Sequence, residues 1–124
     1  MVNIVFKNES YNIVGACMEV HSNLGKGFNE VVYKDALELE FSERKIPFVR
    51  EKAFTIFYKN KALNHNYYAD FVLYDNIIFE VKCTKSIIDD HIKQTLNYMA
   101  ITKSKLGIIA NFGEKSFNYK RIVV

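Results

Sequence analysis

The sequence contains no tryptophan, a single proline and only five glycines among its 124 residues. So little proline, together with a hydrophobic content of 49%, argues against an intrinsically disordered chain. A chain of this length is large enough to form a core of its own. We therefore expect one domain over residues 1–124.

Cysteine is also scarce, since Cys17 and Cys83 are the only two. A zinc site would need more ligands at closer spacing. We expect both thiols to be reduced and the protein to be cytoplasmic. No apolar run approaches the ~20 residues of a membrane span, and residues 1–7 lack the layout of a signal peptide.

Motifs of two common enzyme classes are missing as well. Gly25-Lys26-Gly27 is too short for a phosphate-binding loop, and it follows a predicted helix rather than a strand. The sequence has no Gly-x-Ser-x-Gly elbow of a serine hydrolase.

The net charge of +3 is too small to indicate nucleic-acid binding by itself, but the charge is unevenly distributed. Residues 82–124 contain eight Lys or Arg against three Asp or Glu, whereas residues 1–81 carry a net −2. A basic C-terminal third is able to follow a phosphate backbone. An ordinary solvated surface explains the same residues, and charge alone slightly favours that interpretation.

Hydrophobic periodicity predicts three helices and five strands. The helices are expected at 11–22, 28–44 and 87–102, and the strands at 48–58, 65–74, 77–83, 106–110 and 117–124. The apolar run at 106–110 is typical of a buried central or parallel strand, and we expect the last strand at an edge. The order α-α-β-β-β-α-β-β predicts an α/β (α+β) fold, with helices packed on a mixed β-sheet.

Two of the predicted strands carry charged residues inside apolar runs, namely Asp70 in one strand and Glu80 and Lys82 in the next. Burying any of these groups without a partner is costly. We therefore expect the three side chains to face one another or a bound cation.

The connection between these two strands decides which side chains meet. A two-residue turn would place Asp70 opposite Val81, on the wrong face. A three-residue connection at 74–76, or a bulge, places Asp70 opposite Glu80. The same register collects the apolar residues on the other face, namely Phe71, Leu73, Ile77, Phe79 and Val81. The hydrophobic pattern therefore favours the register that brings the carboxylates together.

Two converging carboxylates repel each other unless a cation lies between them. Mg²⁺ suits such a site because it prefers oxygen ligands and keeps several waters, one of which can act as a nucleophile. Lys82 would then orient the water, help to deprotonate it or pair with a phosphate. A salt bridge from Lys82 to Asp70 or Glu80 explains the same residues without a metal, and the cluster alone leaves both interpretations open.

Glu30 begins the second predicted helix, and its spacing aligns it with an apolar stripe formed by Tyr33, Leu37 and Phe41. The helix macrodipole favours an acid in the first turn. That preference explains an acid but not its place on the stripe, so we interpret Glu30 as a functional residue.

The helix at 87–102 carries His91, Gln94 and Tyr98 on one flank. The neighbouring apolar stripe comprises Ile88, Ile92, Leu96 and Met99. The polar flank is positioned to border a cleft, where Gln94 and Tyr98 would bind phosphate or a metal-bound water. A polar boundary between core and solvent is the commoner explanation, and His91 by itself fits a surface or supporting role better than that of a ligand.

Three motifs, at 27–33, 70–82 and 94–98, carry a family resemblance. Asp70 followed by Glu80-x-Lys82 resembles the signature of the PD-(D/E)XK nuclease superfamily, and Gln94-x-x-x-Tyr98 resembles an additional motif of its exonuclease-related branches. Gly27-x-x-Glu30-x-x-Tyr33 is similar to the motif that names the GxxExxY proteins within that superfamily. The segments at 105–113 and 120–123 also resemble that family, so the similarity extends from about residue 11 to 124.

The resemblance implies a restriction-endonuclease-like core and a Mg²⁺-dependent nuclease, with Mn²⁺ as a substitute. We expect its substrate to be nucleic acid, namely DNA. The resemblance also implies metal ligation by Asp70, Glu80 and the Val81 carbonyl, with Lys82 positioning water. The supporting residues would be Glu30, Tyr33, His91, Gln94 and Tyr98. Ala69 stands where the superfamily name has proline.

Two alternatives to a nuclease stay open. One is a nucleic-acid-binding or regulatory module that keeps the fold without catalysis, and the other is an interaction protein with a structural salt-bridge network. Sequence specificity in so short a chain would require a homodimer or a partner protein, and we expect no membrane partner.

Overall fold

The computed structural model describes residues 5–124. The helices are α1 (Lys7–Leu24), α2 (Glu30–Glu43) and α3 (Asp89–Thr102). The strands are β1 (Phe48–Tyr58), β2 (Lys61–Leu73), β3 (Ile77–Lys82), β4 (Leu106–Asn111) and β5 (Asn118–Val123). The predicted order of elements is confirmed. None of the helices in residues 5–124 is both long and apolar enough to cross a membrane.

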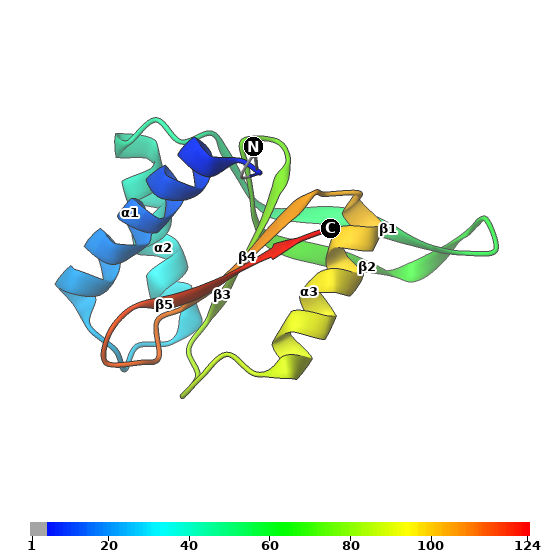
Figure 1. Cartoon of the computed structure of the whole chain (residues 1–124). Coiled ribbons are helices and arrows are strands. Elements are labelled where there is room, and N and C mark those ends of the chain that lie inside the picture. The colour runs from blue at the N-terminus through cyan, green and yellow to red at the C-terminus, as the bar shows by residue number, and fades with distance from the viewer. Residues whose placement is uncertain (1–4) are drawn as a thin grey trace, which may run out of the picture.

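The five strands form one mixed sheet in the order β1-β2-β3-β4-β5. The pairs β1–β2, β2–β3 and β4–β5 are antiparallel, while β3 and β4 are parallel and are joined through α3. The predictions of a parallel, fully buried strand at 106–110 and of a last strand at the edge are therefore confirmed. In Figure 1, α1 and α2 lie on one side of the sheet and α3 lies on the other.

The central strands present an apolar side to α1 and α2. The α2 side chains of Tyr33, Leu37 and Phe41 are fully buried there. They pack against alternate residues of the central strands, namely Phe71, Leu73, Ile77, Phe79, Val81, Leu106, Ile108 and Ala110. Because alternation is strict, the residues between these positions point toward α3.

The packing of α3 differs from the predicted apolar stripe. Met99 is buried as expected, but Leu96 and Ile88 are 39% and 49% exposed, so that part of the prediction is wrong. Thr95 takes the buried position instead, because the helix lies against Gly107 of β4. A Cβ at Gly107 would lie 2.8 Å from the side chains of both Met99 and Thr95. Glycine at this position therefore permits the close approach of α3 to the sheet.

The register between β2 and β3 is the one that requires a three-residue connection. Leu73 pairs with Ile77, and Phe71 pairs with Phe79. Continuing this register places Asp70 opposite Glu80, as predicted. The connection also adopts left-handed backbone conformations at its first two residues, Tyr74 and Asp75.

The hairpin of β1 and β2 is longer than expected, because β2 begins at Lys61 rather than at residue 65. Its turn residues, Lys59 and Asn60, both have positive φ angles, as in a tight turn whose twist matches the strands. Figure 1 shows the end of this hairpin extending well beyond the rest of the molecule.

Candidate functional site

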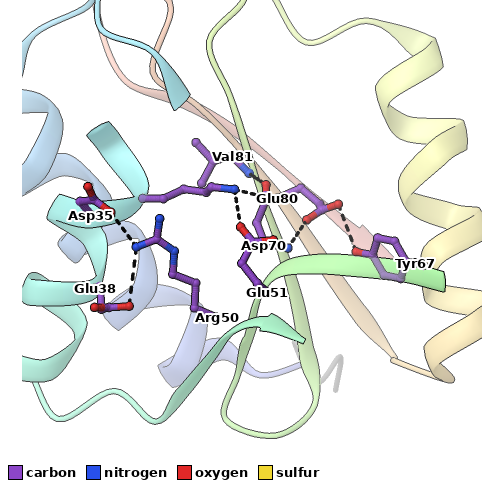
Figure 2. Close-up of polar contacts among 9 residues, drawn as sticks. Asp35, Glu38, Arg50, Glu51, Tyr67, Asp70, Glu80 and Val81 are labelled. Carbon is purple, nitrogen blue, oxygen red and sulfur yellow. Dashed lines mark hydrogen bonds and ion pairs between the residues drawn. The ribbon is translucent and has the colours of Figure 1, made fainter. Parts of the chain in front are cut away.

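The carboxylates of Asp70 and Glu80 are held by each other's strands. The ladder between β2 and β3 ends at the Phe71–Phe79 pair. One step further, the Asp70 backbone N–H donates to Glu80 Oε2 at 2.9 Å, and the Val81 N–H donates to Asp70 Oδ2 at 2.8 Å. Figure 2 shows the two carboxylates side by side where the strands separate. Side chains thus replace the missing ladder bonds and fix both acids in orientation.

Glu80 is the more deeply placed of the two acids, with 6% of its surface exposed. The Tyr67 hydroxyl donates to its Oε1 at 3.1 Å. Burial and the nearby charge of Asp70 raise the pKa of Glu80 to about 7, although the hydrogen bonds and the charge of Lys82 act in the opposite direction. A buried acid facing a second acid is an arrangement that a cation would relieve.

The ion pair of Asp70 is made with Lys34 of α2. Lys34 Nζ lies 3.1 Å from Asp70 Oδ1 and 2.6 Å from Glu51 Oε1. In residues 5–124, Lys82 forms no ion pair with either acid. The salt bridge predicted for Lys82 is therefore wrong, because the lysine that pairs with Asp70 is Lys34.

Sequence reasoning missed Lys34 altogether. It lies four residues after Glu30 on α2, so helical spacing places it on the flank that carries Glu30. Burial acts to lower the pKa of Lys34, but its hydrogen bonds to Glu51 and Asp70 outweigh burial and raise the pKa above its usual value. Lys34 is thus held in its charged form beside Asp70.

Glu51, the second partner of Lys34, occupies an irregular position in β1. The pairs Arg50–Phe71 and Lys52–Ala69 flank it, so Glu51 lies beside Asp70 without forming a regular pair. Its φ of 55° is in the left-handed region, which a non-glycine residue adopts only at a conformational cost. The backbone is therefore distorted next to the two acids, a feature that the sequence pattern does not reveal.

Six of the residues singled out from the sequence line one pocket of about 550 Å³. They are Glu30, Asp70, Glu80, Lys82, Gln94 and Tyr98. The remaining lining comes from β1 and β2, namely Ile56, Asn66, Tyr67 and Tyr68. The pocket therefore lies between the first turn of α2, the flank of α3 and the strands that carry the acids.

Tyr98 joins α3 to the acids through an aromatic stack. Its ring lies 3.8 Å from that of Tyr67, with the two planes inclined by 13°. Burial, followed by the charges of Glu80 and Asp70, raises the pKa of Tyr98 above its usual value. Its phenol therefore remains a neutral hydrogen-bond donor at the edge of the pocket.

Tyr33 and His91 lie outside this lining. The Tyr33 hydroxyl donates to the carbonyl of Gly25 at 2.6 Å, which ties the loop before α2 to the core. His91 Nδ1 accepts a hydrogen bond from the Ile88 N–H at 3.2 Å at the start of α3. Each residue fixes the beginning of a helix that contributes to the pocket.

The two cysteines are free. Burial, with the charge of Glu30 as a smaller cause, raises the pKa of Cys83 to about 11. The pKa of Cys17 is raised by burial as well. Neither thiol has the lowered pKa of a nucleophilic cysteine.

Residues 5–124 contain no cluster of three or more His, Cys, Asp or Glu side chains arranged to hold a metal. What the pocket offers is the pair of Asp70 and Glu80, whose four oxygens each already accept one hydrogen bond. Because a carboxylate has about four acceptor sites, lone pairs remain on both.

One protein-family model matches residues 7–122, and its description is the PD-(D/E)XK nuclease superfamily. No curated protein and no solved structure matches the chain.

Proposed function

The chain belongs to the PD-(D/E)XK nuclease superfamily, and we propose that it is a Mg²⁺-dependent nuclease that hydrolyses phosphodiester bonds in DNA. The observation that carries the proposal is the pair of Asp70 and Glu80 in the lining of one pocket, where the Asp70 N–H donates to Glu80 and the Val81 N–H donates to Asp70. The mixed sheet flanked by helices is consistent with a restriction-endonuclease-like fold.

The donor set fits a hard divalent cation. Two carboxylates converge in a partly buried place, and the charge of one raises the pKa of the other. Mg²⁺ is often bound through only one or two carboxylates because it retains several waters, so a third acidic ligand is not required. Asp70, Glu80 and the Val81 carbonyl would hold the ion. When bound, Mg²⁺ lowers the pKa of a coordinated water and stabilises negative charge on the phosphate.

The other lining residues have roles that follow from their charge and place. Lys82 lies in the pocket without an ion-pair partner in residues 5–124, so its ammonium is available to orient water or to pair with a phosphate oxygen. Gln94 and Tyr98 present an amide and a neutral phenol, which donate hydrogen bonds to phosphate. Glu30, an exposed residue of the pocket lining, would hold a water that approaches the phosphate.

Digestion assays test this proposal directly. Linear, circular and single-stranded DNA, and RNA, are incubated with Mg²⁺ or Mn²⁺ and the purified protein. We expect cleavage that falls about 100-fold or more in Asp70→Asn and Lys82→Ala, because each removes a group that stabilises the transition state. Asp75→Asn and Lys115→Ala change exposed residues outside the pocket and should cleave like wild type. Cleavage that survives both pocket substitutions would contradict the mechanism.

A second function is favoured by one observation, the ion pair between Lys34 and Asp70. An ammonium that already neutralises Asp70 is suited to a nucleic-acid-binding module without catalysis. Calorimetric titration with Mg²⁺ separates the two functions. Binding that is lost in Asp70→Asn supports the nuclease, whereas DNA binding without Mg²⁺ binding or cleavage supports the module.

A further inference from the structure

The hairpin of β1 and β2 extends past the point where the rest of the sheet supports it. β3 pairs only with residues 71–73 of β2, whereas β1 and β2 continue pairing to Tyr58 and Lys61. Phe54 and Ile56 still pack near α3, through Tyr98 and Ile101. Beyond them the hairpin is a two-stranded ribbon, visible in Figure 1 as the projecting arm. We call residues 52–69, which comprise both the part that packs near α3 and the projecting end, the hairpin arm.

The hairpin arm exposes large apolar side chains that no packing requirement explains. Phe57 and Tyr58 are 64% and 61% exposed, and Tyr68 and Leu63 are 56% and 45% exposed. Two-stranded ribbons gain little stability from such residues when they face solvent. Apolar side chains concentrated on one projecting element are typical of a binding surface.

The charge of the hairpin arm has one sign. It contains Lys52, Lys59 and Lys61 together with His65, and all of the acidic residues of the protein lie outside it. Two of the lysines sit over aromatic rings, with Lys59 Nζ 5.4 Å from the Tyr58 ring centre and Lys52 Nζ 5.4 Å from that of Phe54. Cations interleaved with aromatic rings are complementary to a chain of phosphates and bases.

The hairpin arm is continuous with the pocket of the proposed active site. Ile56, Asn66, Tyr67 and Tyr68 line that pocket, and β2 leads from them directly to Asp70. A strand of nucleic acid lying along the arm would therefore arrive at the two acids.

We propose that the hairpin arm binds a single-stranded segment of nucleic acid and guides it to the pocket. Bases stack on the exposed rings of Phe57 and Tyr58, whose consecutive positions in β1 place them on opposite faces of the ribbon, while Lys59 and Lys61 pair with phosphates. Unpaired bases are the fitting partner because their faces are free, whereas a duplex hides them. This inference rests on the proposed function, since it names the form of substrate for the same site.

The test measures binding by fluorescence anisotropy in EDTA, so that cleavage does not interfere. The probe is a labelled oligothymidylate of about 20 nucleotides, with a duplex of equal length for comparison. We expect the single strand to bind more tightly than the duplex. The Kd should rise about fivefold or more in each of Phe57→Ala and Tyr58→Ala, because each removes a stacking platform. Tyr11→Ala, at an 81% exposed aromatic residue on α1, should bind like wild type.

The lysines are tested through salt dependence. The slope of log Kd against log salt concentration should fall by about 1.4 in the double variant Lys59→Ala/Lys61→Ala, since each single-strand phosphate contact contributes about 0.7. Lys7→Ala, an exposed residue at the start of α1, should leave the slope unchanged. Circular dichroism checks that all variants fold.

The outcomes separate this inference from the proposed function. If wild type cleaves DNA while the Phe57, Tyr58 and lysine variants bind and cleave equally well, the hairpin-arm proposal is overturned and the nuclease stands. If the variants lose single-strand binding in EDTA and wild type cleaves nothing, the arm proposal is supported and catalysis is not. A change of oligomeric state in the aromatic variants with unchanged DNA binding would assign the arm to protein contacts and overturn the proposal.

Discussion

The two faces of the sheet use the same strands for opposite purposes. On the α1 and α2 face, Phe79 and Val81 of β3 lie fully buried among apolar residues. Glu80, between them in sequence, points the other way and carries a pKa of about 7 in the pocket below α3. The direction of the Glu80 side chain is therefore fixed by its apolar neighbours. Glu80 could reach the other face only if Phe79 and Val81 left the core.

The largest effect should come from breaking the apolar face. Phe79 is fully buried and contacts the rings of Phe41 and Phe71 edge-on, at 5.7 and 6.0 Å. Phe79→Ala should lower the free energy of unfolding by about 3–5 kcal/mol, through lost burial and the cavity left behind. Urea unfolding followed by circular dichroism measures the loss. A loss below about 1 kcal/mol would mean that this face does not anchor β3.

A smaller effect should appear on the pocket face as pH changes. The pKa of Glu80 is raised from 4.5 to about 7 in the folded state, so Glu80 favours folding most below pH 4.5, and this contribution is lost as pH rises through 7. In EDTA, wild type should therefore lose about 2 kcal/mol of stability between pH 5 and pH 8 relative to Glu80→Gln.

Urea unfolding of both proteins at a series of pH values measures this difference. Glutamine is the matched replacement, because its amide oxygen can accept from the Asp70 N–H while its amide nitrogen donates to the Tyr67 hydroxyl oxygen. Mg²⁺ should reduce the pH effect in wild type, since a cation and a proton compete for Glu80. Parallel pH profiles for the two proteins would argue against a strained acid at this position.

The smallest effect should come from the ion pairs between α2 and β1. Lys34→Met removes the counter-charge of Asp70 and should cost about 1 kcal/mol of stability in EDTA, because the pair is partly exposed. Arg50→Met is the matched control, since Arg50 joins the same two elements through Asp35 at 2.7 Å, away from the acids (Figure 2).

Thermal unfolding with and without Mg²⁺ distinguishes these two variants. Mg²⁺ should raise the Tm of Lys34→Met more than that of wild type, because the cation no longer competes with an ammonium for Asp70. Arg50→Met should respond like wild type. Equal Mg²⁺ responses in all three proteins would mean that Lys34 does not affect cation binding at Asp70.

The sequence was informative wherever periodicity and charge constrained each other. The apolar residues of β2 and β3 allowed one register, and that register required the Asp70–Glu80 pairing that the structure contains. Helical spacing brought Glu30, Gln94 and Tyr98 to the pocket for the same reason. The register and the placement of these side chains were predictable because alternation and helical pitch are local rules.

Features that depend on contacts between distant elements could not be predicted from the sequence. Nothing in the spacing of α2 shows that Lys34 reaches Asp70, because that depends on the crossing of α2 over β1 and β2. Leu96 was wrongly assigned to the core because the contact of α3 with Gly107 rotates Thr95 inward. No sequence pattern indicates the left-handed backbone of Glu51, because glutamate normally avoids this conformation.

The hydrogen bonds between the two strands also make two backbone amides sensitive to the charge of the carboxylates that they contact. The Asp70 N–H points at Glu80, and the Val81 N–H points at Asp70. The chemical shift of each amide in a ¹⁵N-correlated NMR spectrum should therefore follow the charge on the opposing carboxylate. The two amides thus report on the two carboxylates separately when protons or Mg²⁺ are added, in the native sequence and before any substrate is known.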